Sequence, residues 1–297
     1  TLWLKFFQLY SYPKSFFFRL KPFQNNKKRV CYNNNMALEV FSIKARRMQG
    51  KFDLYNEIRK IVKNNDVSLQ NGDILVISSK YVSNSQGRIL DQNSISSSEK
   101  AKEISKKFSI NDKLSEAVIR ESDIVFGGVS GFVITSSDNI MAPNAGIDKS
   151  NSQNKFILYP TDPYLLAEQI RRKFFLDYYI HIGIIIVDSR LMPARIGTVG
   201  IAIACSGIEP VLDRRATKDL DGNPLKVTFQ AIADNLASIA NHKMGEGDET
   251  LPLAIIRNSG AKITDRMINP KEMAISYDEC VYVRGLKNWE VDGMTTY

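Results

Sequence analysis

The apolar positions of this chain alternate between strand-like runs and helical spacings. Residues 38–43 alternate as a strand, and residues 53–63 carry apolar side chains at helical spacing. Residues 74–77 and 182–187 are continuously apolar, which indicates strands covered on both faces of a sheet. The pattern therefore predicts a mixed α/β fold.

The same alternation continues along the rest of the chain. Helices are predicted over residues 97–108, 113–121, 160–175 and 227–242, and further strands over 132–135, around 201–203 and over 252–257. Gly87 and residues 218–222 are predicted breaks or turns. No repeat or low-complexity linker marks a domain boundary.

The two ends of the chain differ from its middle. Residues 1–35 hold seven of the net eight positive charges and many aromatics without helical or strand periodicity. We therefore expect 1–35 to be a disordered or loosely attached tail, or an upstream extension translated in error. Residues 36–287 are predicted to form the folded domain, and 288–297 a C-terminal tail.

Charge and cysteine content limit the class of protein. The body is nearly neutral once the first 35 residues are set aside, so a broad nucleic-acid surface is not expected. The longest uncharged apolar stretch, residues 178–187, is too short for a membrane helix and is predicted to be a buried strand. Cys31, Cys205 and Cys280 form no CxxC pair, which favours a reducing, cytoplasmic setting.

Three acidic residues are candidates for a metal site. Asp148, Asp188 and Glu246 each lie among small or polar residues at the edge of an apolar segment. With two histidines and three scattered cysteines in the chain, a bound metal would need oxygen ligands, which favours magnesium or manganese. The alternative is three solvated loop carboxylates, and for any one of them alone it is the better reading.

Candidate phosphate contacts are less specific. No Walker A string occurs, so a P-loop fold is excluded, but backbone amides at helix starts and glycine turns can still hold phosphate. Met244 to Gly247 could form such a loop or a simple helix cap. Ser79 with Lys80 could contact an anion or cap a turn, and His181 is interpreted as a core residue.

Five strings in order carry a family resemblance. They are GDILVISSKYVS with Gly87 and Arg88, then NAGIDKSN from Asn144, then Asp188 with Ser189, then residues 218–222, then MGEG from Met244. Together they resemble the coenzyme F-420:L-glutamate ligase (gamma-glutamyl ligase) family from about Val40 to Arg257. The resemblance implies a two-lobed fold with mixed sheets and no P-loop, which would occupy residues 36–287.

The family's activity and ligands follow from the resemblance as expectations. It implies a GTP-dependent ligase that joins L-glutamate to the carboxylate of the deazaflavin F-420-0, then adds a second glutamate by a gamma linkage, and a homodimer using manganese or magnesium and potassium. The implied metal ligands are Asp148, Asp188, Ser189 and Glu246. The implied GTP contacts are Arg46, Arg47, Met48, Gln49, Ser79, Lys80, Asn84, Asn151, Met244, Gly245, Glu246, Gly247, Asp248, Glu249, Thr250 and Leu251.

The chain also departs from the family pattern. Asn84 stands where the family usually has Lys, Arg46 and Arg47 replace a Leu-Pro pair, and residues 190–192 replace a stretch containing Gly-Arg. Asn258 stands where the family has Gly after Arg257. Two alternatives stay open. The first is a divergent relative that adds an amino acid to another acidic small molecule, and the second is a non-catalytic protein that binds nucleotide or RNA.

Overall fold

The computed structural model describes residues 36–48, 50–149 and 154–287 of the chain, which alternate between strands and helices. The expected tails at residues 1–35 and 288–297 lie outside this part. The larger elements are β1 (Glu39–Ile43), α2 (Leu54–Asn64), β2 (Ile74–Ser78), α3 (Ser79–Gln86), α4 (Glu99–Phe108), α5 (Asp112–Glu121), α6 (Pro163–Tyr178), β8 (Gly183–Leu191), β9 (Thr198–Ser206), α7 (Ile232–Met244), β12 (Leu253–Arg257) and α8 (Val281–Lys287). The predicted mixed α/β class is confirmed.

Short strands and 3-10 turns connect these elements. They are β3 (Ile89–Asp91), η1 (Gln92–Ser94), β4 (Ile124–Val129), β5 (Phe132–Ser137), β6 (Ile140–Pro143), η2 (Asn144–Gly146), β7 (Lys155–Ile157), β10 (Val211–Asp213), β11 (Phe229–Ala231) and η3 (Pro270–Glu272). Three small sheets result, in the orders β4-β5-β6, β3-β7 and β10-β11.

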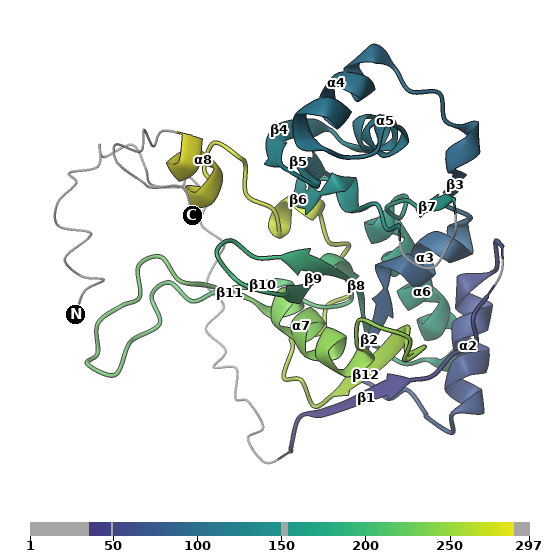
Figure 1. Cartoon of the computed structure of the whole chain (residues 1–297). Helices are drawn as coiled ribbons and strands as arrows, with labels where there is room; N and C mark the ends of the chain where they lie inside the picture. Colours follow the sequence, from purple (N-terminus) through teal and green to yellow (C-terminus); the bar gives the residue numbers. More distant parts are fainter. Residues whose placement is uncertain (1–35, 49, 150–153, 288–297) are drawn as a thin grey trace. The chain divides into compact units, whose positions relative to one another are not determined.

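A five-stranded sheet in the order β1-β12-β2-β8-β9 lies at the centre of the fold (Figure 1). β12 pairs antiparallel with both β1 and β2, β2 pairs parallel with β8, and β8 pairs antiparallel with β9. β12 is the last of these strands in sequence, yet it lies between the first two. The carboxyl ends of β1, β2 and β8 therefore meet at one edge of the sheet.

The main core surrounds this sheet. Ile74 to Ile77 of β2 and Ile184 to Ile186 of β8 are fully buried, as their continuous apolar runs predicted. Side chains from α2, α3, α6 and α7 complete the same core. Since both faces of the central strands are covered, burial of apolar surface is the main stabilising contribution here.

A second core forms between α4, α5 and the three-stranded sheet. Its buried side chains include Phe108, Leu114, Val118, Val133 and Phe156. Both helices carry a side-chain N-cap, from Ser98 and Asn111 respectively. We identify the two cores with the two lobes that the resemblance implies; the exact extent of each domain stays a prediction.

The structure corrects three predicted elements. Residues 79–86 form α3, although no helix was predicted there, because this helix is buried on several sides and lacks an amphipathic period. α6 continues to Tyr178 and β8 begins only at Gly183, so the first residues of the predicted strand 178–187 end the helix and connect it to β8 instead. α7 begins only at Ile232, because Phe229–Ala231 pairs with β10 as β11.

His181 is not the core residue that the sequence suggested. Its side chain is 44% exposed, and its Nδ1 lies 3.2 Å from Oδ1 of Asp265. The ring packs on Phe175, with 4.8 Å between centroids. Position 181 precedes β8, so the apolar run that follows it does not bury it.

Asp265 also belongs to an ion network on α6. Glu168 accepts two hydrogen bonds of 2.9 Å from Arg171, and Arg171 Nη1 donates to Asp265 at 3.1 Å. Arg172 and Ser206 donate to the same Glu168 carboxylate, each at 2.5 Å. Glu168 and Arg171 are both buried, so each charge depends on the other.

Gly200 sets the distance between β9 and α7. A Cβ at this position would lie 2.4 Å from Cβ of Asn241 and 2.9 Å from the carbonyl oxygen of Ala237. We expect Gly200→Ala to lower the free energy of unfolding by about 2 kcal/mol, because backbone must move to admit the methyl group. Urea unfolding followed by circular dichroism measures this.

Gly285 provides the matched control for that substitution. An added Cβ at Gly285 meets no described atom within 4 Å, and the residue lies in α8. Gly285→Ala should therefore leave the stability unchanged or raise it slightly. Equal effects at the two glycines would contradict a steric role for Gly200.

Candidate active site

Four chain segments meet at one edge of the five-stranded sheet. Because β12 is antiparallel to both β1 and β2, these two strands run in the same direction, and β8 runs parallel to β2. Their carboxyl ends therefore share an edge with the chain that enters β12. We call this edge the carboxyl edge, formed by residues 44–48, 79–80, 188–191 and 245–252. Such an edge of an α/β sheet is where ligands commonly bind.

The register of the parallel pair places Ser79 beside Asp188. Ser78 of β2 is paired with Val187 of β8, so the next residue on each strand is adjacent as well. Ser79 Oγ donates to Asp188 Oδ1 at 2.6 Å. Ser79 is also the first residue of α3, whose amino-terminal N–H groups therefore point toward this edge. A strand end, a helix start and a carboxylate thus come together.

Lys80 extends the group to the second lobe. Its Nζ lies 2.5 Å from Oδ2 of Asp148, and both side chains are about one third exposed. Asp148 is held by two backbone hydrogen bonds of 2.9 Å with Ile157 at the end of β7. Because Ile147 belongs to the second core and Lys80 lies in the first turn of α3, which packs in the main core, this ion pair links the two cores at the site.

Asp188 pairs with a buried arginine on its own strand. Arg190 Nη1 lies 2.6 Å from Oδ2 of Asp188, and the arginine side chain is 7% exposed. The two residues share a face of β8 because side chains alternate along a strand. Arg190 also packs against Tyr159, with its Cζ 5.8 Å from the ring centroid. Burial raises the pKa of the Tyr159 hydroxyl, and the nearby guanidinium opposes that rise.

Ser189 lies on the opposite face and contacts Glu246. Its Oγ donates to Glu246 Oε1 at 2.6 Å, and Asn241 of α7 donates to the same oxygen at 2.8 Å. Thr198 on β9 adds a third donor at 3.3 Å. The carboxylate of Glu246 is thus fixed by polar groups from β8, β9 and α7.

The loop that enters β12 is tied to the ends of two strands. Ala45 N–H donates to the Thr250 carbonyl at 3.0 Å, and Ser78 N–H donates to the Pro252 carbonyl at 2.9 Å. Gly245 has a φ of +78°, and a Cβ there would lie 2.3 Å from Glu249 Oε1. Glu249 in turn accepts from the Gly247 N–H at 2.8 Å. Glycine at 245 therefore lets the loop fold back over its own glutamate.

The remaining predicted nucleotide contacts are less closely connected. Arg46 is exposed, and its Nε lies 3.6 Å from Glu57 Oε1 of α2. Asn84 follows Lys80 by four residues on α3, so it lies on the same side of that helix. Met48 packs on the main core. Gln49 and Asn151 lie outside the described residues, while Arg47, Asp248 and Leu251 belong to the segments that form the carboxyl edge or adjoin it.

The predicted metal ligands lie in one region, although they do not surround a common point. Among residues 36–48, 50–149 and 154–287, no three His, Cys, Asp or Glu side chains form a group able to hold a metal ion. Asp148 is paired with Lys80 and Asp188 with Arg190. The oxygen donors suit magnesium or manganese chemically, but an ion could bind several of them only if these side chains rearranged. The metal site stays a prediction.

Sequence reasoning missed three residues that shape the site. Arg190 was noted only as a departure from the family, and Tyr159 and Asn241 were given no role. The alternation of Asp188 and Arg190 on one strand was the available signal, because it places both side chains on one face. Nothing local indicated Tyr159 or Asn241, which reach the site through tertiary packing.

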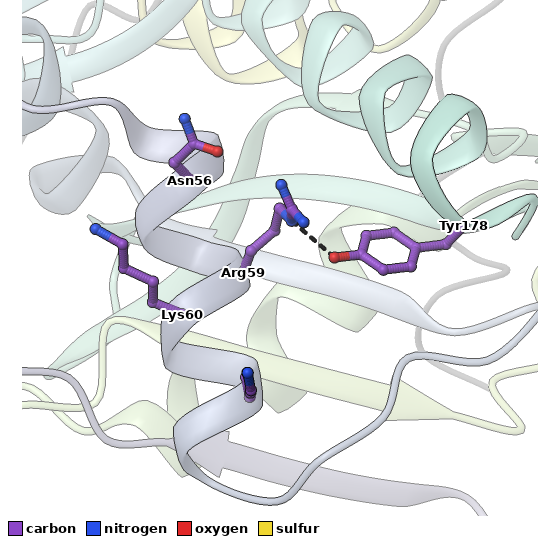
Figure 2. Close-up of a pocket in the computed structure, with 5 residues that line it drawn as sticks. Asn56, Arg59, Lys60 and Tyr178 are labelled. Atoms are coloured by element: carbon purple, nitrogen blue, oxygen red, sulfur yellow. Dashed lines mark hydrogen bonds between the residues drawn. The ribbon is translucent and has the colours of Figure 1, made fainter.

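A hollow of about 420 Å³ lies elsewhere, along α2 (Figure 2). Asn56, Arg59, Lys60 and Lys63 line it together with Tyr178 at the end of α6. Arg59 Nε donates to Tyr178 Oη at 2.7 Å, and Nη1 lies 3.5 Å from Asp177 Oδ2. None of these residues is among the predicted contacts. The hollow is an exposed basic surface, and we assign it no role in catalysis.

No helix in the part of the chain that the structure covers is long and apolar enough to span a bilayer.

Comparison with known proteins identifies a similar family. The family model described as F420-0:Gamma-glutamyl ligase matches residues 42–258. The coenzyme F420:L-glutamate ligase of Methanocaldococcus jannaschii is 37% identical over 209 residues, which cover 69% of this chain and 84% of that protein. The protein of the same name from Archaeoglobus fulgidus is 32% identical over 223 residues, covering 75% and 88% respectively. A third, from Methanopyrus kandleri, is 34% identical over 191 residues, covering 64% and 76%.

Proposed function

We propose, since the chain belongs to the F420-0:gamma-glutamyl ligase family, that it joins L-glutamate to the carboxylate of coenzyme F420-0. We further propose that GTP drives the reaction and that a second glutamate is added through a gamma linkage. The observation that carries the proposal is the carboxyl edge itself. Segments separated by up to about 200 residues bring Ser79, Lys80, Asp188 and Glu246 to one end of the sheet.

The chemistry needs an activated carboxylate. A carboxylate is a poor acyl donor because hydroxide is a poor leaving group. In the proposed reaction a carboxylate oxygen of F420-0 attacks the γ-phosphorus of GTP, which releases GDP and forms an acyl phosphate. The amine of glutamate then attacks the acyl carbon, phosphate leaves, and the amine loses a proton to give the amide.

The residues of the carboxyl edge suit a phosphoryl transfer. Such transfers depend mostly on positioning and on balancing negative charge. Lys80 and the first N–H groups of α3 offer a cation and hydrogen-bond donors to phosphate oxygens. Ser79 orients Asp188, and Asn241 orients Glu246.

A divalent cation belongs to the same proposal. Magnesium or manganese held by Asp148, Asp188, Ser189 and Glu246 would neutralise phosphate oxygens during transfer. Lys80 and Arg190, which now neutralise Asp148 and Asp188, would have to give up those contacts. The use of potassium, the homodimer and the cytoplasmic location stay predictions.

Product analysis tests the function directly. The purified chain is incubated with GTP, manganese, glutamate and F420-0, and the product is weighed by mass spectrometry. We expect a gain of one or two glutamyl residues with release of GDP, and no gain when GTP is omitted. GDP release with other acidic acceptors alone would instead support a divergent ligase. If neither GDP nor a glutamylated product formed, the result would contradict both the F420-0 ligase and the divergent ligase.

Lys80 provides a test of the nucleotide site. We expect Lys80→Met to weaken GTP binding about tenfold, because a partly buried cation beside the phosphates is lost. Isothermal titration of GTP into the protein measures the change. Lys100→Met, an exposed lysine on α4, is the control and should bind GTP as the parent does. Equal affinity of Lys80→Met and the parent would exclude Lys80 from the site.

A further inference from the structure

One face of α2 carries basic side chains and forms the wall of the hollow shown in Figure 2. Asn56, Arg59, Lys60 and Lys63 follow one another at intervals of three and four residues, so they share a face of the helix. The apolar residues of α2 are buried in the main core, and this face is directed away from it. Tyr178, at the end of α6, completes the wall. We call these five residues the α2 surface.

Arg59 is held in place before any ligand binds. Its Cζ lies 5.6 Å from the ring centroid of Tyr55 and 5.4 Å from that of Tyr178. Its Nε donates to Tyr178 Oη at 2.7 Å, and its Nη1 lies 3.5 Å from Oδ2 of Asp177. The side chain is nevertheless 40% exposed. A ligand therefore meets a charged group whose conformational freedom is already reduced, which favours binding.

The α2 surface has an excess of positive charge. Arg59, Lys60 and Lys63 line the hollow, and among the described residues no carboxylate does. Two carboxylates lie nearby, Asp177 beside Arg59 and Glu57 beside Lys60, so the cations outnumber them. Because the body of the chain is nearly neutral, this excess is a property of the α2 surface and not of the whole molecule. It favours a ligand with negative charge.

A second hollow connects the α2 surface with the carboxyl edge. Its volume is about 290 Å³, and its lining comprises Lys44, Ala45, Arg46, Glu57, Lys60, Ile61, Asn64 and Asn65. Lys60 lines both hollows. Residues 44–46 belong to the carboxyl edge, and the Ala45 N–H is bonded to the loop that enters β12. The two hollows together form a path along α2 from the carboxyl edge to Tyr178.

The proposed acceptor has the chemistry that this path would recognise. F420-0 is a deazaflavin with a phosphate group between its planar ring and its reacting carboxylate. Arginine and lysine bind phosphate oxygens, and the exposed ring of Tyr178 offers an aromatic contact. GTP also combines a planar ring with phosphate, but its phosphates are expected at Lys80 and the first turn of α3.

We propose that the α2 surface binds the phosphate and the ring of F420-0 while the carboxylate of this acceptor lies at the carboxyl edge. The α2 surface thus determines which acceptor the enzyme accepts, and it takes no part in the chemical steps. The inference rests on the proposed function, because that proposal makes F420-0 the acceptor.

Binding of F420-0 without GTP tests the inference. F420-0 is titrated into the full chain by isothermal calorimetry. We expect Arg59→Gln to raise the Kd about tenfold, because a charged hydrogen-bond donor to phosphate is lost. Arg120→Gln is the control: Arg120 is 51% exposed, pairs with Glu116 on α5 and lines neither hollow, so this variant should match the parent.

Lys63→Gln guards against a folding defect in the Arg59 variant. Lys63 is exposed and lies in the last turn of α2, so glutamine should leave the fold intact. We expect a Kd for F420-0 about threefold above that of the parent, because an exposed charge contributes less. Lys100→Gln, on α4, should leave the Kd unchanged. Parent-like affinity in Lys63→Gln, or in an Arg59→Gln variant that circular dichroism shows to be folded, would overturn the inference.

GTP binding and turnover separate the inference from its alternatives. Arg59→Gln should bind GTP as the parent does, and in the ligase assay it should raise the KM for F420-0 with kcat nearly unchanged. Weaker GTP binding with unchanged F420-0 binding would overturn the inference and assign the α2 surface to the nucleotide. Failure of the parent to bind F420-0 would overturn it as well. F420-0 binding that depends on Arg59, without glutamate addition by the parent, would contradict the proposed ligase but support the inference.

Discussion

Asp188→Asn is expected to lower the rate of glutamate addition at least about 1000-fold. The amide preserves the shape of the side chain and can still accept a hydrogen bond from Ser79, but it cannot supply the negative charge that a metal ligand needs. Single-turnover formation of glutamylated F420-0, at saturating GTP and manganese, measures the rate.

Two further variants distinguish catalysis from folding. Asp188→Asn also leaves the buried Arg190 without its counter-charge, so part of the loss could come from instability. The double variant D188N/R190Q removes both charges and should regain stability without regaining activity. Asp213→Asn is the control: Asp213 is the last residue of β10, its carboxylate is exposed and pairs with Arg215, and the variant should keep the parent rate. Recovery of activity in the double variant would contradict a chemical role for Asp188.

Glu168→Gln should be the most destabilising of the substitutions considered, with a loss of about 3–5 kcal/mol in the free energy of unfolding. It leaves the buried Arg171 without its main counter-charge, and it weakens the bonds that Arg172 and Ser206 donate. Urea unfolding measures the loss. Glu99→Gln breaks an exposed ion pair with Lys102 on α4 and should leave the midpoint unchanged. Similar urea midpoints for the two variants would mean that the buried ion network on α6 stabilises the fold no more than an exposed ion pair does.

The same residue makes stability depend on acidity. Burial alone would raise the pKa of Glu168, but hydrogen bonds from Arg171, Ser206 and Arg172 outweigh it and lower the pKa to about 2. A carboxylate with a lowered folded-state pKa stabilises the protein above its unfolded-state pKa, and that contribution is lost as pH falls. Stability of the parent should therefore decline from about pH 4.5 toward 2, and Glu168→Gln should show a shallower decline there.

The sequence alone predicted the elements whose pattern is local. β2 and β8 were visible because strands buried on both faces are apolar at nearly every position. α2 was visible because a helix buried on one face repeats its apolar positions at helical spacing. α3 was missed because its buried residues, among them Tyr81, Val82 and Ser85, lie on several sides of the helix. β11 was mistaken for helix because its pairing with β10 is a tertiary contact.

The site required information that local patterns do not contain. Asp148, Asp188 and Glu246 were selected for their loop-like surroundings, but their neighbours depend on the strand order. Ser79 meets Asp188 only because β2 and β8 are parallel partners in a fixed register. The position of Ser79 and Lys80 at the end of a strand suggested an anion contact, and the family resemblance specified it as GTP. The ion pairs with Lys80 and Arg190 could not be read from the sequence, because they depend on side-chain positions in the folded chain.

The position of β12 has a consequence for synthesis of the protein on the ribosome. This strand is the last of the five to be translated, yet it separates β1 from β2. Until Arg257 has left the exit tunnel, the nascent chain holds two strands whose backbone groups have no neighbour on that side, and such strands invite pairing with other chains. A polypeptide terminated before Leu253 would keep that hazard permanently and would never complete the carboxyl edge.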